Sequence, residues 1–245
     1  WVMQKQGRWD GLATILRTAR LITRWRPDVV FSLLAYVNLL TGLSTKICGG
    51  DPVWVPSIRN DPLRNRWTNG LWRRLLNDED MVVAVSREVS RSFCSRFAVA
   101  PENTVTIHNP FDFSRIKDAG PGKPRGSFSG SIVATMGRLT AQKDQATLLQ
   151  AVAQIARRRD VRLALLGEGP MHAELKDLAA RLGIAERVEF RGFVPNPLAI
   201  VRSADLFVLS SRWEGFPNAL MEAMACGVAS ISTRCPYGPD EIIED

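Results

Sequence analysis

Two glutamates, Glu214 and Glu222, lie eight residues apart in the sequence, and their carboxylates could accept hydrogen bonds from hydroxyl groups. A buried strand at 206–209 precedes Glu214 and Gly215 follows it, so this carboxylate should lie on a loop. Glu222 should lie in a helix that begins near Pro217, about 7 Å along the axis from N–H groups that attract phosphate. This distance between Glu222 and the helix start would suit a ribose beside a diphosphate. Either glutamate alone is better explained as a solvated charge.

Two cations, Arg138 and Lys143, follow another expected strand and precede a helix that Asp144 could cap. An arginine can bind phosphate oxygens through two parallel hydrogen bonds, and a lysine adds a compact positive charge. The pair could therefore neutralise a diphosphate. Taken alone, these residues are equally well explained as two exposed charges near a helix start.

Apolar periodicity predicts alternating helices and strands along the chain. Helices are expected at 10–25, 38–44, 65–77, 87–97, 144–158, 170–182 and 197–202. Strands are expected at 28–32, 53–57, 81–85, 105–107, 131–136, 161–166, 188–190, 206–209 and 228–232. Such alternation predicts an α/β fold with parallel sheets covered on both faces, in which ligands bind outside the carboxyl ends of the strands.

The helix that begins near Pro217 should end at Gly227, because glycine readily adopts the conformation that stops a helix. Its expected apolar face comprises Leu220, Met221, Met224 and Ala225. Glu222 should point away from that face.

Glycine and proline are concentrated between 120 and 130, with six of them in eleven residues. Such a composition is typical of a linker between domains. We therefore predict an N-terminal domain at 1–115, a linker at 116–130 and a C-terminal domain at 131–245.

The formal net charge of +7 lies almost entirely in the first half of the chain. Residues 1–115 carry 16 Lys or Arg against 10 Asp or Glu, which gives +6, and residues 116–245 carry 16 against 15, which gives +1. The asymmetry favours an anionic partner for the first half, either an acidic lipid surface or a polyanionic acceptor. A basic solvated surface explains it equally well. The sequence contains no recognisable nucleic-acid-binding motif, so nucleic acid is not expected as a partner.

Several other classes of protein are not favoured by the composition. The sequence has no apolar run of 18 or more residues, and its first residues do not resemble a signal peptide, so a cytoplasmic location is expected. Its four cysteines and two histidines show no metal-ligand spacing, so neither a metal nor another cofactor is expected.

Several motifs occur in a fixed order and together resemble a known family. They are Gly137-Arg138-Leu139 followed by Lys143-Asp144, Gly167-Glu168-Gly169-Pro170, Phe190-Arg191-Gly192-Phe193, Glu214 with Glu222 eight residues on, and Glu222-Ala223-Met224-Ala225-Cys226-Gly227. The pattern resembles the retaining glycosyltransferases of the GT-B fold, in family 4, also called glycosyl transferases group 1. The resemblance covers most of the chain. It implies two Rossmann-like domains that face a cleft, both incomplete at the chain termini, as expected for an internal fragment.

The resemblance also implies a role for each matching residue. Arg138 and Lys143 would hold the donor diphosphate, Glu214 would contact the hydroxyls of the transferred sugar, and Glu222 would accept hydrogen bonds from the ribose. Arg191 and Phe193 would lie beside the nucleobase. The remaining donor-binding positions would be Gly137, Gly167, Phe216, Pro217, Asn218, Ala219 and Leu220. The histidine that many relatives place near the strand end at 29–38 is missing here, so acceptor-side catalytic residues are not named.

The implied reaction moves a sugar from a nucleotide sugar to a glycan or lipid-linked acceptor with retained configuration. A UDP-sugar is preferred over GDP-mannose as donor, and no metal is required. The leaving phosphate would take the acceptor proton, so catalysis would depend on positioning and on stabilising the departing diphosphate. Two alternatives stay open: a GT-B sugar-nucleotide epimerase or hydrolase, and a non-catalytic, membrane-associated nucleotide-binding protein. The expected location is cytoplasmic, with peripheral binding to the inner face of the membrane.

Overall fold

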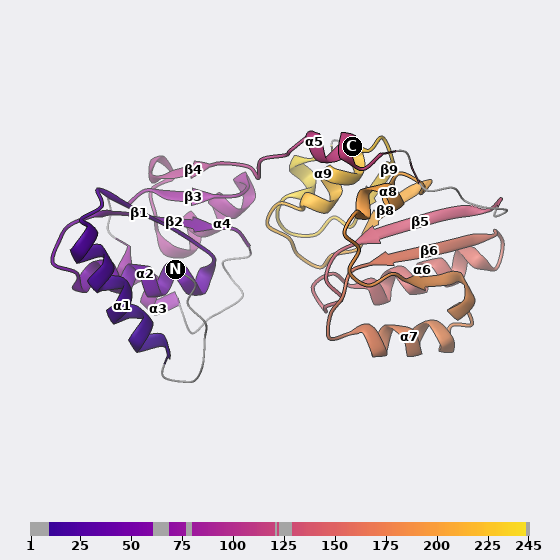
Figure 1. The fold of residues 1–245 in the computed structure, drawn as a ribbon, viewed down its shortest axis with the longest axis horizontal. Coiled ribbons are helices and arrows are strands. Elements are labelled where there is room, and N and C mark those ends of the chain that lie inside the picture. The colour runs from indigo at the N-terminus through magenta and orange to yellow at the C-terminus, as the bar shows by residue number, and fades with distance from the viewer. Residues whose placement is uncertain (1–9, 61–68, 77–79, 121, 123–128, 244–245) are drawn as a thin grey trace. The chain divides into compact units, whose positions relative to one another are not determined.

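The computed structural model describes residues 10–60, 69–76, 80–120, 122 and 129–243, which form two compact units, Trp1–His108 and Asn109–Asp245 (Figure 1). The division between the units precedes the predicted boundary at 115–116 by a few residues. Helix α5 (Ser114–Asp118) begins just before that boundary, and Ile116 and Ala119 pack against Leu198 of the second unit. This apolar contact explains why the segment belongs to the second unit. Residues 121 and 123–128 of the predicted linker lie outside the described residues.

The first unit contains a parallel four-stranded sheet in the order β1-β2-β3-β4. Its elements are α1 (Asp10–Trp25), β1 (Val29–Leu33), α2 (Ala35–Ile47), β2 (Val53–Ile58), α3 (Asn69–Leu75), β3 (Val82–Ala84), α4 (Arg87–Phe97) and β4 (Thr104–Thr106). Part of the helix predicted at 65–77 lies outside the described residues. In the described residues, no helix is long and apolar enough to span a membrane.

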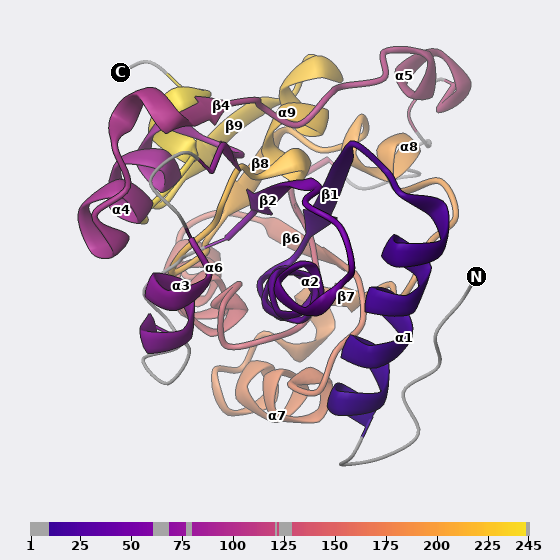
Figure 2. The same ribbon diagram turned by 90° about the vertical axis from the view of Figure 1, so that its left-hand side faces the viewer.

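The described helices of the first unit cover one face of its sheet (Figures 1 and 2). Helices α2 and α4 contact the strands, while α1 and α3 pack on α2. An aromatic cluster fills this side, with Trp72 stacked on Trp54 and edge-on to Phe93. On the other face, Phe31 and Val53 are exposed, together with Val29, Leu33 and Val105. The prediction of helices on both faces is therefore wrong for the described part of this sheet.

The second unit contains a parallel five-stranded sheet in the order β7-β6-β5-β8-β9. Its further elements are β5 (Ser131–Met136), α6 (Gln145–Ala156), β6 (Val161–Leu166), α7 (His172–Arg181), β7 (Val188–Phe190), α8 (Pro197–Val201), β8 (Leu206–Leu209), α9 (Asn218–Ala225) and β9 (Ala229–Ser232). Several bounds agree with the predicted ones to the residue, including those of β5, β6, β7 and β8.

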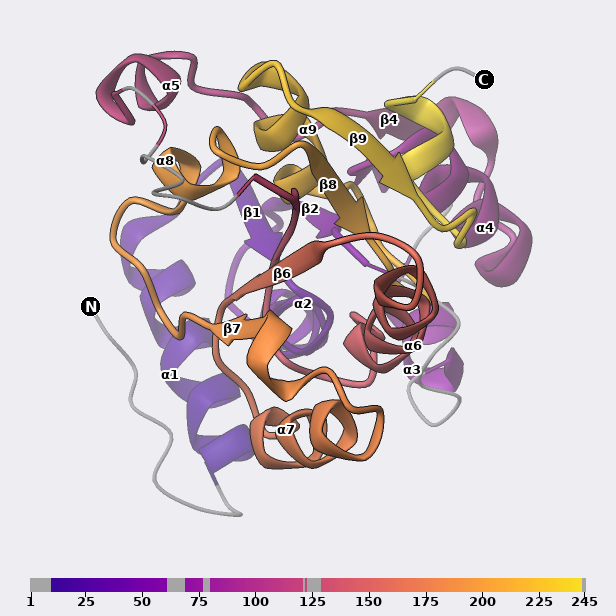
Figure 3. The same cartoon turned by 90° about the vertical axis from the view of Figure 1, so that its right-hand side faces the viewer.

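Both faces of this second sheet are covered by helices, as predicted (Figure 3). Successive residues of a strand point to opposite faces, so Leu163 and Ala164 of β6 enter two different cores. Helices α6 and α7 complete the core around Leu163, and α8 and α9 complete the core around Ala164. Apolar surface is thus removed from water on both sides of the sheet.

Helix α9 differs from its predicted orientation. Leu220 and Ala223, three residues apart, are its fully buried apolar side chains, whereas Met224 is 41% exposed. Glu222 lies among the buried residues instead of pointing to solvent. The predicted apolar face was right for Leu220 and wrong for Met224, because an eight-residue helix offers too few turns for periodicity to distinguish neighbouring faces. Gly227, with φ of 76°, follows the helix end as predicted.

Candidate functional site

Two loops meet at the point where the strand order of the second sheet reverses. From β5 the chain first builds β6 and β7 on one side, and then β8 and β9 on the other. The loop after β5 carries Lys143, and the loop after the neighbouring strand β8 carries Glu214. Parallel sheets bind ligands at such a reversal, outside the carboxyl ends of the strands.

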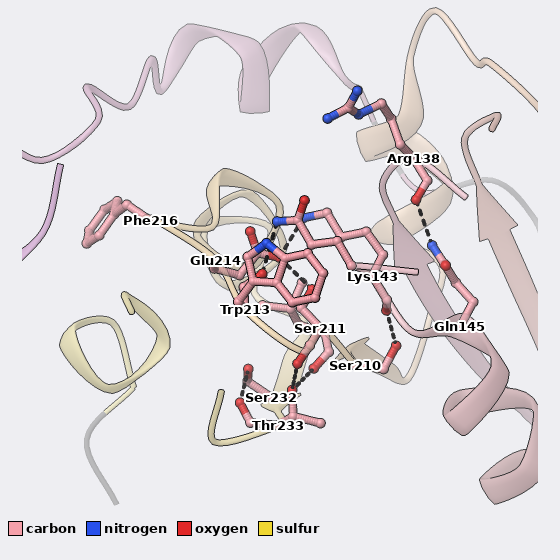
Figure 4. A network of polar contacts seen from close by, with 12 residues as sticks. Arg138, Lys143, Gln145, Ser210, Ser211, Trp213, Glu214, Phe216, Ser232 and Thr233 are labelled. Atoms are coloured by element: carbon pink, nitrogen blue, oxygen red, sulfur yellow. Dashed lines mark hydrogen bonds and ion pairs between the residues drawn. The ribbon is translucent and has the colours of Figure 1, made fainter. Parts of the chain in front are cut away.

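Lys143 and Glu214 form a largely buried ion pair (Figure 4). The ammonium Nζ lies 2.5 Å from Oε1 of the carboxylate, and the side chains are 20% and 8% exposed, respectively. The hydroxyl of Ser211 donates to the same Oε1 at 2.5 Å. The backbone N–H of Glu214 donates to the carbonyl of Pro236 at 3.1 Å, which fixes the loop itself. Two donors on one oxygen hold the carboxylate in a single orientation.

The loop that carries Lys143 is held by side chains on both of its sides. The Ser210 hydroxyl donates to the carbonyl of Lys143 at 2.8 Å, and Nε2 of Gln145 donates to the carbonyl of Arg138 at 3.0 Å. Nε2 of Gln142 donates to the carbonyl of Trp213 at 3.0 Å. The loops after β5 and β8 are therefore joined by side-chain contacts as well as by the ion pair.

Ser211 is anchored through its backbone. The Thr233 hydroxyl donates to the Ser211 carbonyl at 2.6 Å, and the Thr233 N–H donates to the Leu209 carbonyl at 2.9 Å. Sequence reasoning missed Ser210, Ser211 and Thr233. The available signal was the polar pair directly after a buried strand, where a parallel sheet places its ligand-binding residues.

Arg138 does not join this network. Its side chain is exposed and lies apart from the Lys143–Glu214 pair (Figure 4). Among the residues that the structure describes, its guanidinium has no hydrogen bond or ion pair. The structure thus brings Lys143 and Glu214 together and leaves Arg138 at the surface of the same loop.

Glycine is needed where the loop after β6 contacts the loop after β5. A Cβ on Gly167, whose φ is 133°, would lie 2.1 Å from the carbonyl oxygen of Gly137, and one on Gly169 would lie 2.3 Å from that of Leu139. Neither residue could carry a side chain without moving backbone. The family resemblance implied a donor-binding role for Gly167, and this loop contact is a sufficient reason of its own for a glycine there.

The start of α9 is held by Asn109, which the sequence did not single out. Its Nδ2 donates to the carbonyl of Phe216 at 3.2 Å and to Oδ1 of Asn218 at 2.6 Å. Pro217 occupies the N-cap, one residue before the helix. Phe216 and Leu220 are buried and Ala219 is half-buried, so these residues would meet a ligand mainly through backbone groups.

The segment after β7 is largely exposed. Arg191 forms an ion pair with Glu189, and the Phe193 side chain is 78% exposed. The Phe193 N–H donates to Oε1 of Glu168 at 3.3 Å, while the Gly167 N–H donates to the carbonyl of Gly192 at 2.8 Å. An exposed ring beside anchored backbone is compatible with stacking on a base.

The pKa values of Asp144 and Cys235, beside the Lys143–Glu214 pair, differ from their usual values. Burial raises the pKa of Asp144. Hydrogen bonds from Arg212 and Thr147, together with the charge of Arg212, lower it by more, so the pKa lies below its usual value. Asp144 stands at the predicted N-cap position without a side-chain capping bond. Burial, and then the charge of Glu214, raise the pKa of Cys235 to about 11. In the described residues, no group of three or more His, Cys, Asp or Glu side chains could hold a metal ion.

Two family models together match most of the sequence. The model described as glycosyl transferases group 1 matches residues 130–245, and that described as glycosyltransferase family 4 matches residues 2–115. The chain belongs to this family of glycosyltransferases. The two matches correspond closely to the two units of the fold, each with a parallel sheet, and the fold is GT-B.

Similar proteins are longer than this family 4 chain. An uncharacterized glycosyltransferase of Methanocaldococcus jannaschii is 27% identical over 91% of this chain and 60% of its own length. A GDP-mannose-dependent alpha-(1-6)-phosphatidylinositol monomannoside mannosyltransferase of Mycolicibacterium smegmatis is 31% identical over 70% of this chain and 49% of its own. The structure of Anabaena HepE in complex with UDP and glucose superposes with a TM-score of 0.78 at 21% identity, covering 99% of this chain and 68% of that one.

Proposed function

We propose that the protein transfers a sugar from a nucleotide sugar to a glycan or lipid-linked acceptor, with retention of the anomeric configuration. The observation that carries the proposal is the buried Lys143–Glu214 pair at the strand-order reversal of the second unit. A cation and a carboxylate at this position match the two chemical needs of the donor, a diphosphate and sugar hydroxyls. Family membership supports the reaction class.

The chain's own residues would act by binding and positioning the donor. Lys143 would bind the diphosphate and Arg138, exposed on the same loop, would add a second cation as the leaving group departs. Glu214 would accept hydrogen bonds from the sugar, and Glu222 from the ribose. Retention would follow if the leaving phosphate takes the acceptor proton on the same face. The proposal requires no metal and no other cofactor.

A UDP-sugar is the proposed donor, and GDP-mannose is the alternative. The Anabaena structure contains UDP and glucose, whereas the Mycolicibacterium relative is named for GDP-mannose. Phe193 and Arg191 would lie beside the base. A titration of UDP and GDP into the chain, monitored by calorimetry, should show tighter binding of UDP. Tighter binding of GDP would favour GDP-mannose as the donor and would not contradict the proposed binding site.

The transfer itself is tested by product analysis. The full-length enzyme, incubated with a panel of nucleotide sugars, should form a glycoside only when a glycan or lipid-linked acceptor is present, with the anomeric configuration determined by NMR. Release of free sugar at the same rate without acceptor would indicate a hydrolase, and an altered sugar nucleotide would indicate an epimerase. Glu214→Gln should remove product formation, because its neutral amide no longer matches the Lys143 charge.

We also propose peripheral binding to the anionic cytoplasmic face of a membrane through α1. Its exposed surface combines Leu12 and Leu16 with Arg17, Arg20 and Arg24. A basic helix that exposes apolar side chains suits an acidic lipid surface. The chain should co-sediment with vesicles of phosphatidylglycerol and should stay in the supernatant with vesicles of phosphatidylcholine. Equal recovery with both would contradict the proposal.

A further inference from the structure

The two oxygens of the Glu214 carboxylate differ in their hydrogen bonds to the protein. Lys143 Nζ and the Ser211 hydroxyl both contact Oε1. Among the described residues, no side chain or backbone group donates a hydrogen bond to Oε2. One oxygen is therefore occupied by the protein, and the other is left as an acceptor for a ligand.

Ser211 is the more constrained of the two donors. It is 2% exposed, whereas the Lys143 side chain is 20% exposed and carries a flexible stem that can reorient. A serine hydroxyl within hydrogen-bond distance of a carboxylate, held three residues away in the same loop, fixes the side-chain rotation of that carboxylate. If Lys143 turns towards a diphosphate, the contact from Ser211 to Glu214 can persist.

The backbone of Ser211 is also held by the neighbouring strand. The Thr233 hydroxyl, just beyond β9, donates to the Ser211 carbonyl. This contact ties the end of β8 to the end of β9, so the position of the Ser211 hydroxyl depends on two adjacent strands and not on its loop alone. A residue fixed in this way can orient a catalytic group with little loss of entropy on binding.

We propose that Ser211 is a positioning residue, supported by Thr233, that holds Glu214 with Oε2 directed at the sugar of the donor. The inference rests on the proposed function, because it assigns Glu214 to the sugar. It makes a specific distinction between ligands. Ser211 should matter for the sugar of a sugar nucleotide and not for the diphosphate, which Lys143 and Arg138 would bind.

The test compares the affinities of UDP and of a sugar nucleotide in the same variants. Calorimetric titrations use UDP and whichever of UDP-glucose, UDP-N-acetylglucosamine and GDP-mannose the wild-type chain binds most tightly, with GDP replacing UDP in the last case. In Ser211→Ala, affinity for the sugar nucleotide should fall roughly tenfold, as expected for a hydrogen bond to a charged group, while affinity for the free nucleotide changes less than about twofold. Ser230→Ala is the matched control and should leave both affinities unchanged, because it removes a hydroxyl whose one hydrogen bond among the described residues is to the carbonyl of Val228.

A second pair of variants applies if Ser211→Ala fails to fold. Thr233→Val removes the hydroxyl that holds the Ser211 carbonyl, and Thr233→Ser retains it. Thr233→Val should lower affinity for the sugar nucleotide severalfold, and Thr233→Ser should keep it near the wild-type value.

The outcomes separate the inference from the proposed function. Equal losses for the free nucleotide and the sugar nucleotide would mean that Ser211 only supports the fold, and unchanged affinities would mean that it does not orient Glu214. Either result overturns the inference while nucleotide binding by the wild type still supports the proposed function. If the wild-type chain binds none of these nucleotides, the proposed function is wrong and the inference falls with it.

Discussion

The two parallel sheets of this chain differ in how completely its described residues enclose them. In the second unit, helices pack on both faces of the sheet, and a polar network joins the loops at its carboxyl edge. In the first unit, described helices cover one face, and Phe31 and Val53 are exposed on the other. Within the described residues, the same alternation of helix and strand therefore encloses the sheet of the second unit and covers one face of the sheet of the first.

This difference shows that apolar residues in a strand do not by themselves indicate whether a helix packs on that face of the sheet. Burial of apolar surface contributes about 25 cal/mol per Å² to stability. The second sheet is therefore stabilised by burial on both of its faces, and the first mainly by burial on one. The second unit should therefore be sensitive to changes on either face and at its loop contacts. The first should be sensitive on its aromatic side alone.

The largest effect is expected from Gly167→Ala in the second unit. The new Cβ would lie 2.1 Å from the carbonyl oxygen of Gly137, and the φ of 133° is strained for any other residue. The free energy of unfolding of this unit should fall by about 3 kcal/mol or more. Hydrogen exchange followed by mass spectrometry, which reports each unit separately, measures the loss.

Gly50→Ala is the matched control in the first unit, because a Cβ there meets nothing within 4 Å. Its effect on the free energy of unfolding should stay within about 0.5 kcal/mol. Similar losses in both variants would mean that loop contact does not determine which glycines are required.

A smaller effect is expected from breaking the buried ion pair. Lys143→Ala should lower the free energy of unfolding by about 3 kcal/mol, because it leaves the buried Glu214 carboxylate without its cation. Glu214→Ala should cost less, since the Lys143 side chain is partly exposed and can reach water. Urea unfolding of both variants and the double variant gives the coupling free energy.

Asp160→Ala is the control for this second prediction. It removes a more exposed ion pair with Arg187 in the same unit, and should cost less than about 1 kcal/mol. A coupling free energy near zero between Lys143 and Glu214 would contradict the view that burial makes their pair different from this one.

The sequence predicted the elements far better than the contacts between them. Helix α1 and helix α4 match their predicted bounds, because their apolar stripes extend over several turns. The family pattern also placed Lys143 and Glu214 in one site, and the structure does bring them together. Their roles in binding a donor stay predictions.

Two of the missed features depend on contacts between distant parts of the chain. Asn109 bonds to Asn218, 109 residues away, and Thr233 bonds to Ser211 across neighbouring strands. Neither contact leaves a local pattern in the sequence. The burial of Glu222 was missed because its helix is short. The sheet face that no described helix covers was missed because apolar strands look alike whether or not a helix covers them.

A third, smaller effect concerns pH. The pKa of Asp144 lies below its usual value in the folded chain, so the carboxylate stabilises the fold above its unfolded pKa, near 4, and this contribution is lost as pH falls through the lower folded pKa. Asp144→Asn should therefore lower the free energy of unfolding at pH 6 by less than about 1 kcal/mol, because the pair with Arg212 is partly exposed. Urea unfolding should show the difference shrinking below pH 4. A difference that grows on acidification would contradict this sign.

The smallest effect is expected on the uncovered face of the first sheet, and it tests the contrast most directly. Phe31 is 53% exposed, so Phe31→Ser should change the free energy of unfolding by less than about 1 kcal/mol. Phe207, which is 0% exposed between the helices of the second unit, is the matched control, and Phe207→Ser should cost more than about 3 kcal/mol. Hydrogen exchange in each unit gives both values. Because the two residues are of one type on central positions of parallel strands, equal losses would mean that something outside the described residues covers Phe31, and that the two sheets are enclosed alike.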